Sequence, residues 1–108
     1  MTETKNHPHP TLVLLVKFKS RLSLAEVLEI ADNRIDEFRA LAGLKQKYYL
    51  QDVQSGEVAG LYLWESPEAF DEFRNSELRA SIAEAYQTEG EPRVEVFKVF
   101  RTLRENAL

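Results

Sequence analysis

The side chains best suited to chemistry in this sequence are aromatic residues that carry a polar group. Tyr49, Tyr62 and Trp64 lie in two neighbouring strand-like segments, whose expected pairing puts all three on one face. Flat rings on one surface can stack on a flat substrate while their O–H and N–H groups hold its oxygen atoms. The same residues also fit a core or a dimer interface, which is where aromatic residues of paired strands usually lie. Tyr48 points to the opposite face and would take their place if the pocket lies there, since a one-residue change of register exchanges the two sets.

Basic residues inside strands are a second candidate for chemistry. A cationic head there could polarise a substrate oxygen or an enolate. The alternative is that these side chains lie at strand ends or extend to water. The residues concerned are Lys17, Lys47, Lys98 and Arg101.

Many other chemistries are excluded by what the sequence lacks. There are no cysteines, and both histidines, His7 and His9, fall within the first ten residues. The folded body therefore lacks the usual general base and the commonest metal ligand. The sequence contains no phosphate-binding glycine loop, zinc-protease motif or serine-hydrolase motif, and the acidic residues between positions 26 and 37 lack the spacing of a metal site. We therefore expect no metal and no cofactor.

Length and charge limit the class of protein. A chain of 108 residues is long enough for one domain, since single cores are usually built from about 100 to 150 residues. The net charge of −4, with basic residues scattered along the chain, argues against nucleic acid or an anionic membrane as partner. No apolar run is long enough to span a bilayer or to serve as a signal peptide, so a cytoplasmic location is the default expectation.

The elements that must position these residues follow from periodicity and capping signals. We predict a mobile N-terminal tail at 1–10, one domain at 11–104 and a C-terminal tail at 105–108. Ser23 and Glu26 have capping-box spacing and open a helix with apolar steps of three and four residues as far as Ala42, which Gly43 ends. A second helix begins at Ser66-Pro67 and restarts near Asn75-Ser76. The expected strands are 11–19, 44–54, 57–65 and 93–103.

The two central strands form a hairpin around Ser55-Gly56. A two-residue loop places Val53 opposite Val58, Tyr49 opposite Tyr62 and Lys47 opposite Trp64. Both faces of the hairpin carry apolar residues, so both faces need to be covered.

The order of elements, β-α-β-β-α-β, predicts an α+β fold of the ferredoxin-like type, with a four-stranded antiparallel sheet and two helices on one face. Two helices shield only one side of the sheet, whereas the strands are apolar on both sides. A monomer rarely exposes such a surface, so we predict a homodimer in which two sheets face each other.

The chain resembles the dimeric α/β-barrel superfamily, and within it the antibiotic-biosynthesis-monooxygenase-like proteins and the YdhR-type mono-oxygenases. The resemblance covers nearly the whole folded part. Its sharpest stretch is Ala59 to Phe73, AGLYLWESPEAFDEF, which matches a strand ending in an aromatic residue, a short turn and a helix bearing Ala-Phe. The segment at Gly43-Leu44 occupies the place of a "PGF"-like strand opening.

This resemblance implies a small-molecule pocket in each subunit, and oxygen insertion into an electron-rich aromatic or quinone-like substrate without metal or flavin. The haem-degrading branch carries a tryptophan and an axial histidine on its second helix, but Phe73 and Ala83 stand at those positions here, which argues against haem. The candidate pocket residues are Tyr48, Tyr49, Tyr62, Trp64 and Phe73. Two alternatives stay open: a non-catalytic ligand-binding or stress-response protein with the same barrel, and a dimerisation unit with no ligand.

Overall fold

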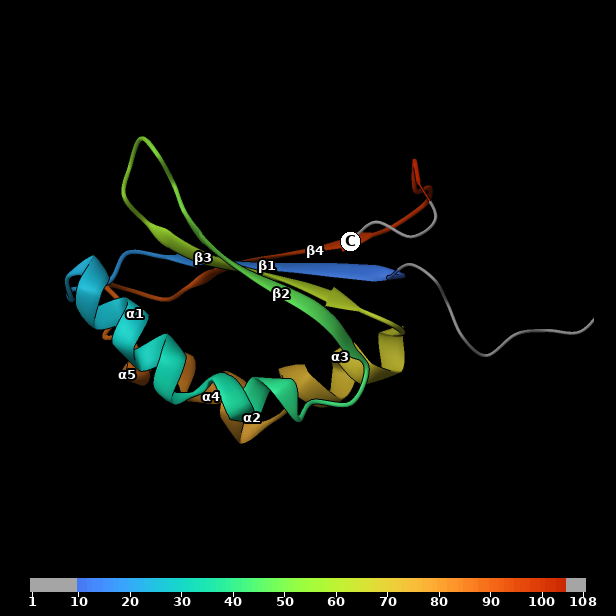
Figure 1. Ribbon diagram of the computed structural model, residues 1–108, viewed down its shortest axis with the longest axis horizontal. Helices are drawn as coiled ribbons and strands as arrows, with labels where there is room; N and C mark the ends of the chain where they lie inside the picture. Colours follow the sequence, from blue (N-terminus) through green and yellow to red (C-terminus); the bar gives the residue numbers. More distant parts are fainter. Residues whose placement is uncertain (1–9, 105–108) are drawn as a thin grey trace, which may run out of the picture.

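The computed structural model describes residues 10–104 and contains one four-stranded antiparallel sheet with all its helices on one face (Figure 1). The strand order is β2-β3-β1-β4. The strands are β1 (Leu12–Phe18), β2 (Leu44–Gln51), β3 (Val58–Trp64) and β4 (Arg93–Lys98). The helices are α1 (Leu24–Asn33), α2 (Ile35–Arg39), α3 (Pro67–Arg74), α4 (Glu77–Ala80) and α5 (Ile82–Ala85). The predicted ferredoxin-like α+β fold is confirmed. The predicted tail at 1–10 lies outside the described residues except for Pro10, and that at 105–108 lies outside them entirely.

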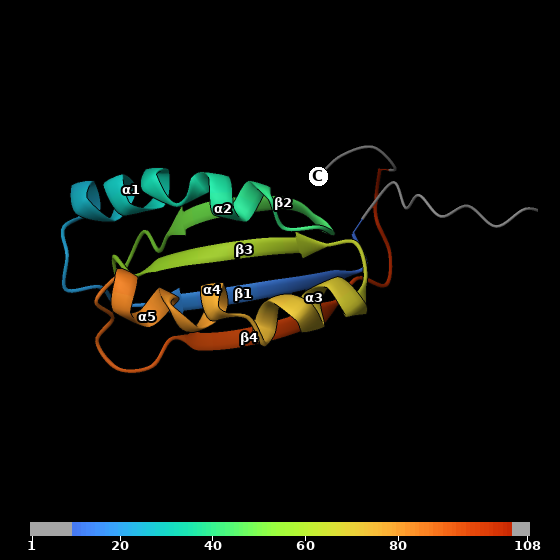
Figure 2. The same cartoon turned by 90° about the horizontal axis from the view of Figure 1, so that it is seen from below.

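The helices form two rows on that face, α1 and α2 in one and α3, α4 and α5 in the other (Figure 2). The first row begins as predicted: the Ser23 hydroxyl accepts a hydrogen bond from the Glu26 N–H, and the Glu26 carboxylate accepts one from the Ser23 N–H at 2.9 Å. The prediction of one continuous helix as far as Ala42 is wrong, because the chain leaves helical geometry at Arg34 and α2 ends at Arg39. The Arg34 side chain extends to the other row, where its Nη2 donates to Ser81 Oγ at 2.7 Å.

Gly43 has a different role from the predicted helix end. Its φ of +84° favours glycine, and a Cβ at this position would lie 2.4 Å from the Ala69 Cβ of α3. The absence of a side chain at Gly43 therefore lets the turn before β2 pack directly on α3. The Glu65 N–H donates to the Gly43 carbonyl at 2.8 Å and fixes the same contact.

The second row is built from repeated serine caps. Ser66 accepts from the Ala69 N–H at 3.2 Å, with Pro67 at the first helical position, and Ser76 accepts from the Arg79 N–H at 3.1 Å. The predicted restart near Asn75-Ser76 is confirmed. A further break at Ser81, next to the contact with Arg34, was not predicted.

The hairpin loop is longer than predicted. The Asp52 N–H donates to the Glu57 carbonyl at 2.7 Å, and the Asp52 carboxylate accepts from the N–H groups of Gln54 and Ser55, so four residues rather than two form the turn. Lys47 consequently faces Tyr62, and Tyr49 faces Gly60. The predicted pairs were wrong by two residues, which leaves Lys47, Tyr49 and Tyr62 on their predicted face, whereas Val53 lies in the exposed loop.

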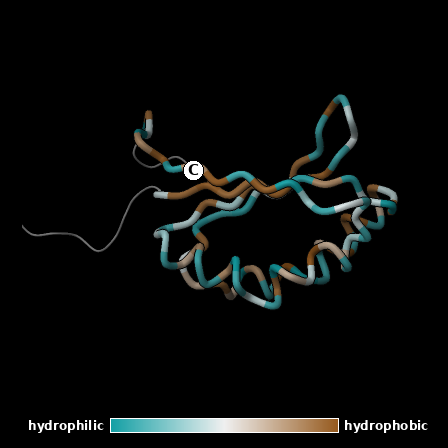
Figure 3. Tube along the Cα trace, turned by 180° about the vertical axis from the view of Figure 1, so that it is seen from behind, coloured by the Kyte–Doolittle hydropathy of each residue, from teal (hydrophilic) through white to brown (hydrophobic). Residues whose placement is uncertain are grey.

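The hydrophobic core lies between the sheet and the two helical rows, and hydrophobic residues are concentrated along the central strands (Figure 3). Trp64 is fully buried at its centre, stacked parallel to Tyr62 with ring centroids 6.2 Å apart. The largest fully buried side chains are Trp64, Tyr62, Phe73, Leu14 and Val16.

The face of the sheet away from the helices, termed the open face below, is also apolar. It includes Tyr48, Leu50 and Phe97, which are 37, 43 and 48% exposed. The last strand ends at Lys98, five residues earlier than predicted, and Phe100 and Leu103 are almost fully exposed. Within residues 10–104, no helix is long and apolar enough to cross a membrane.

Candidate active site

A cavity of about 150 Å³ lies between α1 and the sheet, and is called the α1 pocket below. Its walls come from α1, the three strands β1, β2 and β3, and the end of the second helical row. The side chains that give it chemical character are Lys47, Tyr49, Tyr62 and Tyr86, and most of the remaining lining is aliphatic. Leu24 and Leu28 also line it and are 45 and 51% exposed, which places them at the mouth.

Gly60 leaves the space that the pocket occupies on β3. A Cβ at this position would lie 3.0 Å from the Tyr62 Cε1 and 3.2 Å from the Lys47 Cε. Glycine inside a strand usually marks a close approach of another group, and here that group is the lysine side chain. Gly60 therefore allows Lys47 to lie across the strand surface.

The Lys47 amine is enclosed by aromatic rings. Its Nζ lies 3.6 Å from the ring centroid of Phe38, 4.4 Å from that of Tyr49 and 4.5 Å from that of Tyr62. Within residues 10–104, no carboxylate forms an ion pair with it. A lysine amine that is largely withdrawn from water normally has such a partner, and half-buried Lys47 does not.

Burial, and to a smaller extent the positive charge of Arg34, lower the pKa of Lys47 from its ordinary value of 10.5 to about 7. The three ring faces attract an ammonium group and oppose this shift, each by about 0.5–2 kcal/mol. Near neutral pH, therefore, a substantial fraction of the amine is unprotonated. An unprotonated amine can accept a proton or attack an electrophile.

The tyrosines around the amine stay protonated. Burial raises the pKa of Tyr62, Tyr49 and Tyr86, with the neighbouring tyrosines adding to the effect on Tyr62 and Tyr86. They are therefore hydrogen-bond donors at neutral pH rather than bases. Lys47 is the lining residue whose protonation changes in that range.

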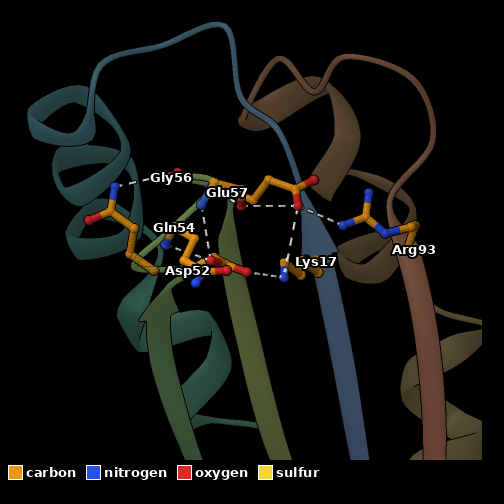
Figure 4. Close-up of polar contacts among 8 residues, drawn as sticks. Lys17, Asp52, Gln54, Gly56, Glu57 and Arg93 are labelled. Atoms are coloured by element: carbon orange, nitrogen blue, oxygen red, sulfur yellow. Dashed lines mark hydrogen bonds and ion pairs between the residues drawn. The ribbon is translucent and has the colours of Figure 1, made fainter.

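A second polar cluster, Lys17, Asp52, Glu57 and Arg93, lies on the open face at the hairpin end (Figure 4). Lys17 Nζ lies 2.5 Å from the Asp52 carboxylate and 3.8 Å from that of Glu57, which in turn lies 2.8 Å from Arg93 Nη2. Each charge has an opposite partner, so this cluster ties the hairpin to β1 and β4. Lys17, one of the basic residues considered for chemistry, therefore has a structural role as part of this cluster.

The candidate residues named from the sequence separate into three groups. Tyr49 and Tyr62 line the α1 pocket. Trp64 and Phe73 are buried in the core beside Tyr62, with its ring centroid 6.2 and 5.2 Å from theirs. Tyr48 lies on the open face.

Four contributors to the site were not among the candidates named from the sequence: Phe38, Tyr86, Arg34 and Gly60. Gly60 carried a usable signal, because an isolated glycine within a strand pattern indicates close approach of another group.

Comparison with solved structures places this geometry in a known fold. The chain is 20% identical to a monooxygenase from the gene ActVA-Orf6 of Streptomyces coelicolor, solved in complex with nanaomycin D, with a TM-score of 0.71 over 92% of this chain and 96% of that one. SnoaB, a cofactor-independent oxygenase from Streptomyces nogalater, is 15% identical with a TM-score of 0.70, over 89% of this chain and 99% of that one. Rv0793 from Mycobacterium tuberculosis is 18% identical with a TM-score of 0.69, over 86% of this chain and 98% of that one.

The chain has the antibiotic-biosynthesis-monooxygenase-like fold. At these identities the likeness establishes the fold and leaves the chemistry to be argued from the residues. No family model matches the sequence, and no curated protein matches it either. The resemblance given by AGLYLWESPEAFDEF is thus confirmed for the antibiotic-biosynthesis-monooxygenase-like fold.

Proposed function

We propose that the protein is a cofactor-independent monooxygenase that oxidises a small phenol or quinol bound in the α1 pocket. The observation that carries the proposal is Lys47, an amine to which no carboxylate of the described residues is paired, set among aromatic rings in an apolar cavity. The presence of a cofactor-independent oxygenase among proteins of the same fold supports it.

The reaction needs one base, and Lys47 supplies it. The amine takes the hydroxyl proton, and the resulting phenolate gives one electron to dioxygen, forming a phenoxyl radical and superoxide. These combine through a carbon–oxygen bond, and the peroxide takes the proton back from the Lys47 ammonium. Loss of the ring proton and cleavage of the oxygen–oxygen bond then release water, so phenol plus dioxygen gives quinone plus water. The tyrosine hydroxyls donate hydrogen bonds to the developing oxyanion.

Pocket size limits the substrate. A cavity of 150 Å³ is close to the engineered cavity of about 150 Å³ that holds one benzene molecule. Typical ligand pockets are larger, about 300–1,000 Å³. The substrate we propose therefore has one aromatic ring inside the pocket, with further groups passing out between Leu24 and Leu28.

The active form we propose is a homodimer joined through the open faces of two sheets. The exposed apolar residues of that face support it, as does the neutral balance of the Lys17 cluster, in which two positive and two negative charges already pair within one chain. Burying such a surface leaves no unpaired charge of the cluster in the interface.

The test is oxygen uptake with a panel of one-ring phenols that have a free para position, with their methyl ethers as controls lacking the acidic proton. We expect uptake with phenols only, and one labelled atom in the quinone when isotopically labelled dioxygen is used. Lys47→Met should lower turnover at least about 100-fold, as loss of a general base does, whereas Lys98→Met, on exposed β4, should leave it unchanged. Absence of uptake and of labelled quinone across the panel would refute the oxygenase.

The second candidate function is a non-catalytic binding protein for a small aromatic ligand. The small cavity volume and the absence of histidine from residues 10–104 favour it. Saturable binding of phenols and of their methyl ethers alike, without oxygen uptake, is the result this function predicts.

A further inference from the structure

We propose that Lys47 is a nucleophilic amine that captures small aromatic aldehydes in the α1 pocket as a covalent imine. It rests on the same Lys47 amine and α1 pocket as the proposed function, but this activity needs no oxygen, so the two are tested by different measurements. It rests on the position of one nitrogen atom in the cavity and on what surrounds it.

The surroundings of Lys47 combine the two conditions under which a lysine becomes a nucleophile: removal from water in an apolar pocket, and a second cation nearby. Lys47 lines the α1 pocket, and the three ring faces of Phe38, Tyr49 and Tyr62 surround its Nζ. Burial lowers the pKa of this amine to about 7. The unprotonated form is therefore present at neutral pH.

Arg34 is the second cation and is fixed in place. Its Nη2 donates to Ser81 Oγ at 2.7 Å, and its guanidinium carbon lies 5.9 Å from the centroid of the same Phe38 ring that the Lys47 amine contacts. Its Nε is buried without a hydrogen-bond acceptor, and within residues 10–104 no carboxylate pairs with it. The uncompensated charge of Arg34 therefore disfavours a second positive charge on Lys47.

Three other lysines of the described chain lack this setting. Lys17 is held by Asp52 on the open face, and Lys19 and Lys98 are exposed to solvent. An aromatic aldehyde reaching the α1 pocket has a further advantage there, because the rings that surround the amine also hold its own ring. Selectivity for Lys47 thus has two sources, the free amine and the aromatic site beside it.

The step is a simple condensation. The Lys47 nitrogen forms a bond to the carbonyl carbon, and the carbonyl oxygen leaves as water with two hydrogens from the nitrogen. The product is a neutral imine on Nζ. A neutral imine suits the site better than an ammonium group, because it removes the repulsion from Arg34.

The experiment uses benzaldehyde, a one-ring probe that matches the cavity, with cyanoborohydride to reduce the imine to a stable benzyl amine. Peptide mass spectrometry of the full chain then locates the benzyl group. We expect labelling of Lys47 at neutral pH at least about tenfold above that of Lys98, since the amine of an exposed lysine is almost fully protonated there. Labelling of Lys47 should follow a midpoint near the pKa of about 7.

The groups that face Lys47 determine how that profile is read. They are Tyr49 on its own strand, Tyr62 on β3, Tyr86 at the end of α5 and Arg34 between α1 and α2. The three tyrosines stay protonated as the amine titrates. A midpoint near 7 therefore reports the amine itself.

Two variants complete the test. Lys47→Met should abolish the selective label. Leu28→Trp, which narrows the mouth and leaves the amine in place, should lower labelling of Lys47 several-fold while that of Lys98 stays the same. Equal labelling of Lys47 and Lys98, or an unlabelled Lys47 in the wild-type protein, would overturn the proposal. Phenol oxidation without aldehyde capture, or the reverse, separates this proposal from the proposed function.

Discussion

Two lysines on opposite faces of one sheet show how the same side chain is used in different ways. Lys17, on the open face, lies within reach of two carboxylates, those of Asp52 and Glu57. Lys47, on the face covered by helices, has aromatic rings around it and an arginine nearby, with no carboxylate paired to it in the described chain. Lys17 is part of a set of paired opposite charges, whereas the Lys47 amine has a lowered pKa and is partly unprotonated near neutral pH.

This difference indicates where chemistry belongs in the fold. A charged side chain that is paired with an opposite charge stabilises a turn and is poorly suited to react with a substrate. A desolvated amine beside a cavity costs stability, and such a cost is typical of functional sites. The four predictions below test the contrast between the two faces.

The largest effect is expected in the core of the covered face. Trp64→Ala should lower the free energy of unfolding by about 3–5 kcal/mol, because it removes a fully buried indole from between Tyr62, Phe70 and Phe73. Urea unfolding measures it. Val53→Ala, in the fully exposed hairpin loop, is the control and should change stability by less than about 0.5 kcal/mol. A loss below about 1 kcal/mol for Trp64→Ala would mean that this face is not the core.

The next effect concerns assembly through the open face. Phe97→Glu should raise the dimer dissociation constant at least about 30-fold, the loss typical of a central interface residue, because it buries an unpaired charge. Val94→Glu is the matched control, since Val94 is exposed on the same strand but on the helix side. Sedimentation velocity over a range of concentrations distinguishes the two variants. Dissociation by both variants equally, or by neither, would remove the open face as the interface.

The third prediction concerns the cost of Lys47. Its lowered pKa means that the unfolded chain binds more protons than the folded chain between about pH 7 and the unfolded value of 10.5, so its destabilising contribution is full below 7 and fades as the pH rises through that window. Lys47→Met should therefore raise the free energy of unfolding by roughly 1–3 kcal/mol at about pH 6, and by less at about pH 9. Denaturant unfolding at both values checks this. A gain that is equal at the two pH values would contradict it.

The smallest effect is expected in the Lys17 cluster. The hydrogen bond from Lys17 holds the pKa of Asp52 well below its ordinary value, so the pair stabilises the fold above about pH 4 and loses this effect as the pH falls below that value. Asp52→Asn should lower the melting temperature slightly at neutral pH, with a difference from wild type that shrinks toward about pH 2. Differential scanning calorimetry measures both. A difference that grows on acidification would show that the ion pair is not its cause.

Much of the fold was predictable because its signals are local. The capping box at Ser23, the Ser66-Pro67 opening and the alternation of apolar residues in the strands each act within a few residues. The face on which Tyr49, Tyr62 and Lys47 lie was also correct despite a wrong loop length, because an error of two residues preserves the alternation of a strand.

The site was less predictable from the sequence, because its key contacts join segments that are distant along the chain. At the break between α1 and α2, Arg34 bonds to the distant Ser81, and Gly60 on the neighbouring strand leaves the space for Lys47. Neither contact is visible in helical or strand periodicity. The lowered pKa of Lys47 depends on burial and on the charge of Arg34, so only the folded arrangement separates it from Lys17.

The pairing of Leu12 with Lys98 has a practical consequence. Leu12 begins β1 and Lys98 ends β4, and the two residues lie side by side at one end of the sheet. Phe18 and Val58, which line the α1 pocket, lie at the other end. A purification handle, a surface anchor or a fused carrier joined before Leu12 or after Lys98 starts from the far end of the sheet. Immobilised protein can thus be screened against libraries of small compounds with the approach to Leu24 and Leu28 left clear.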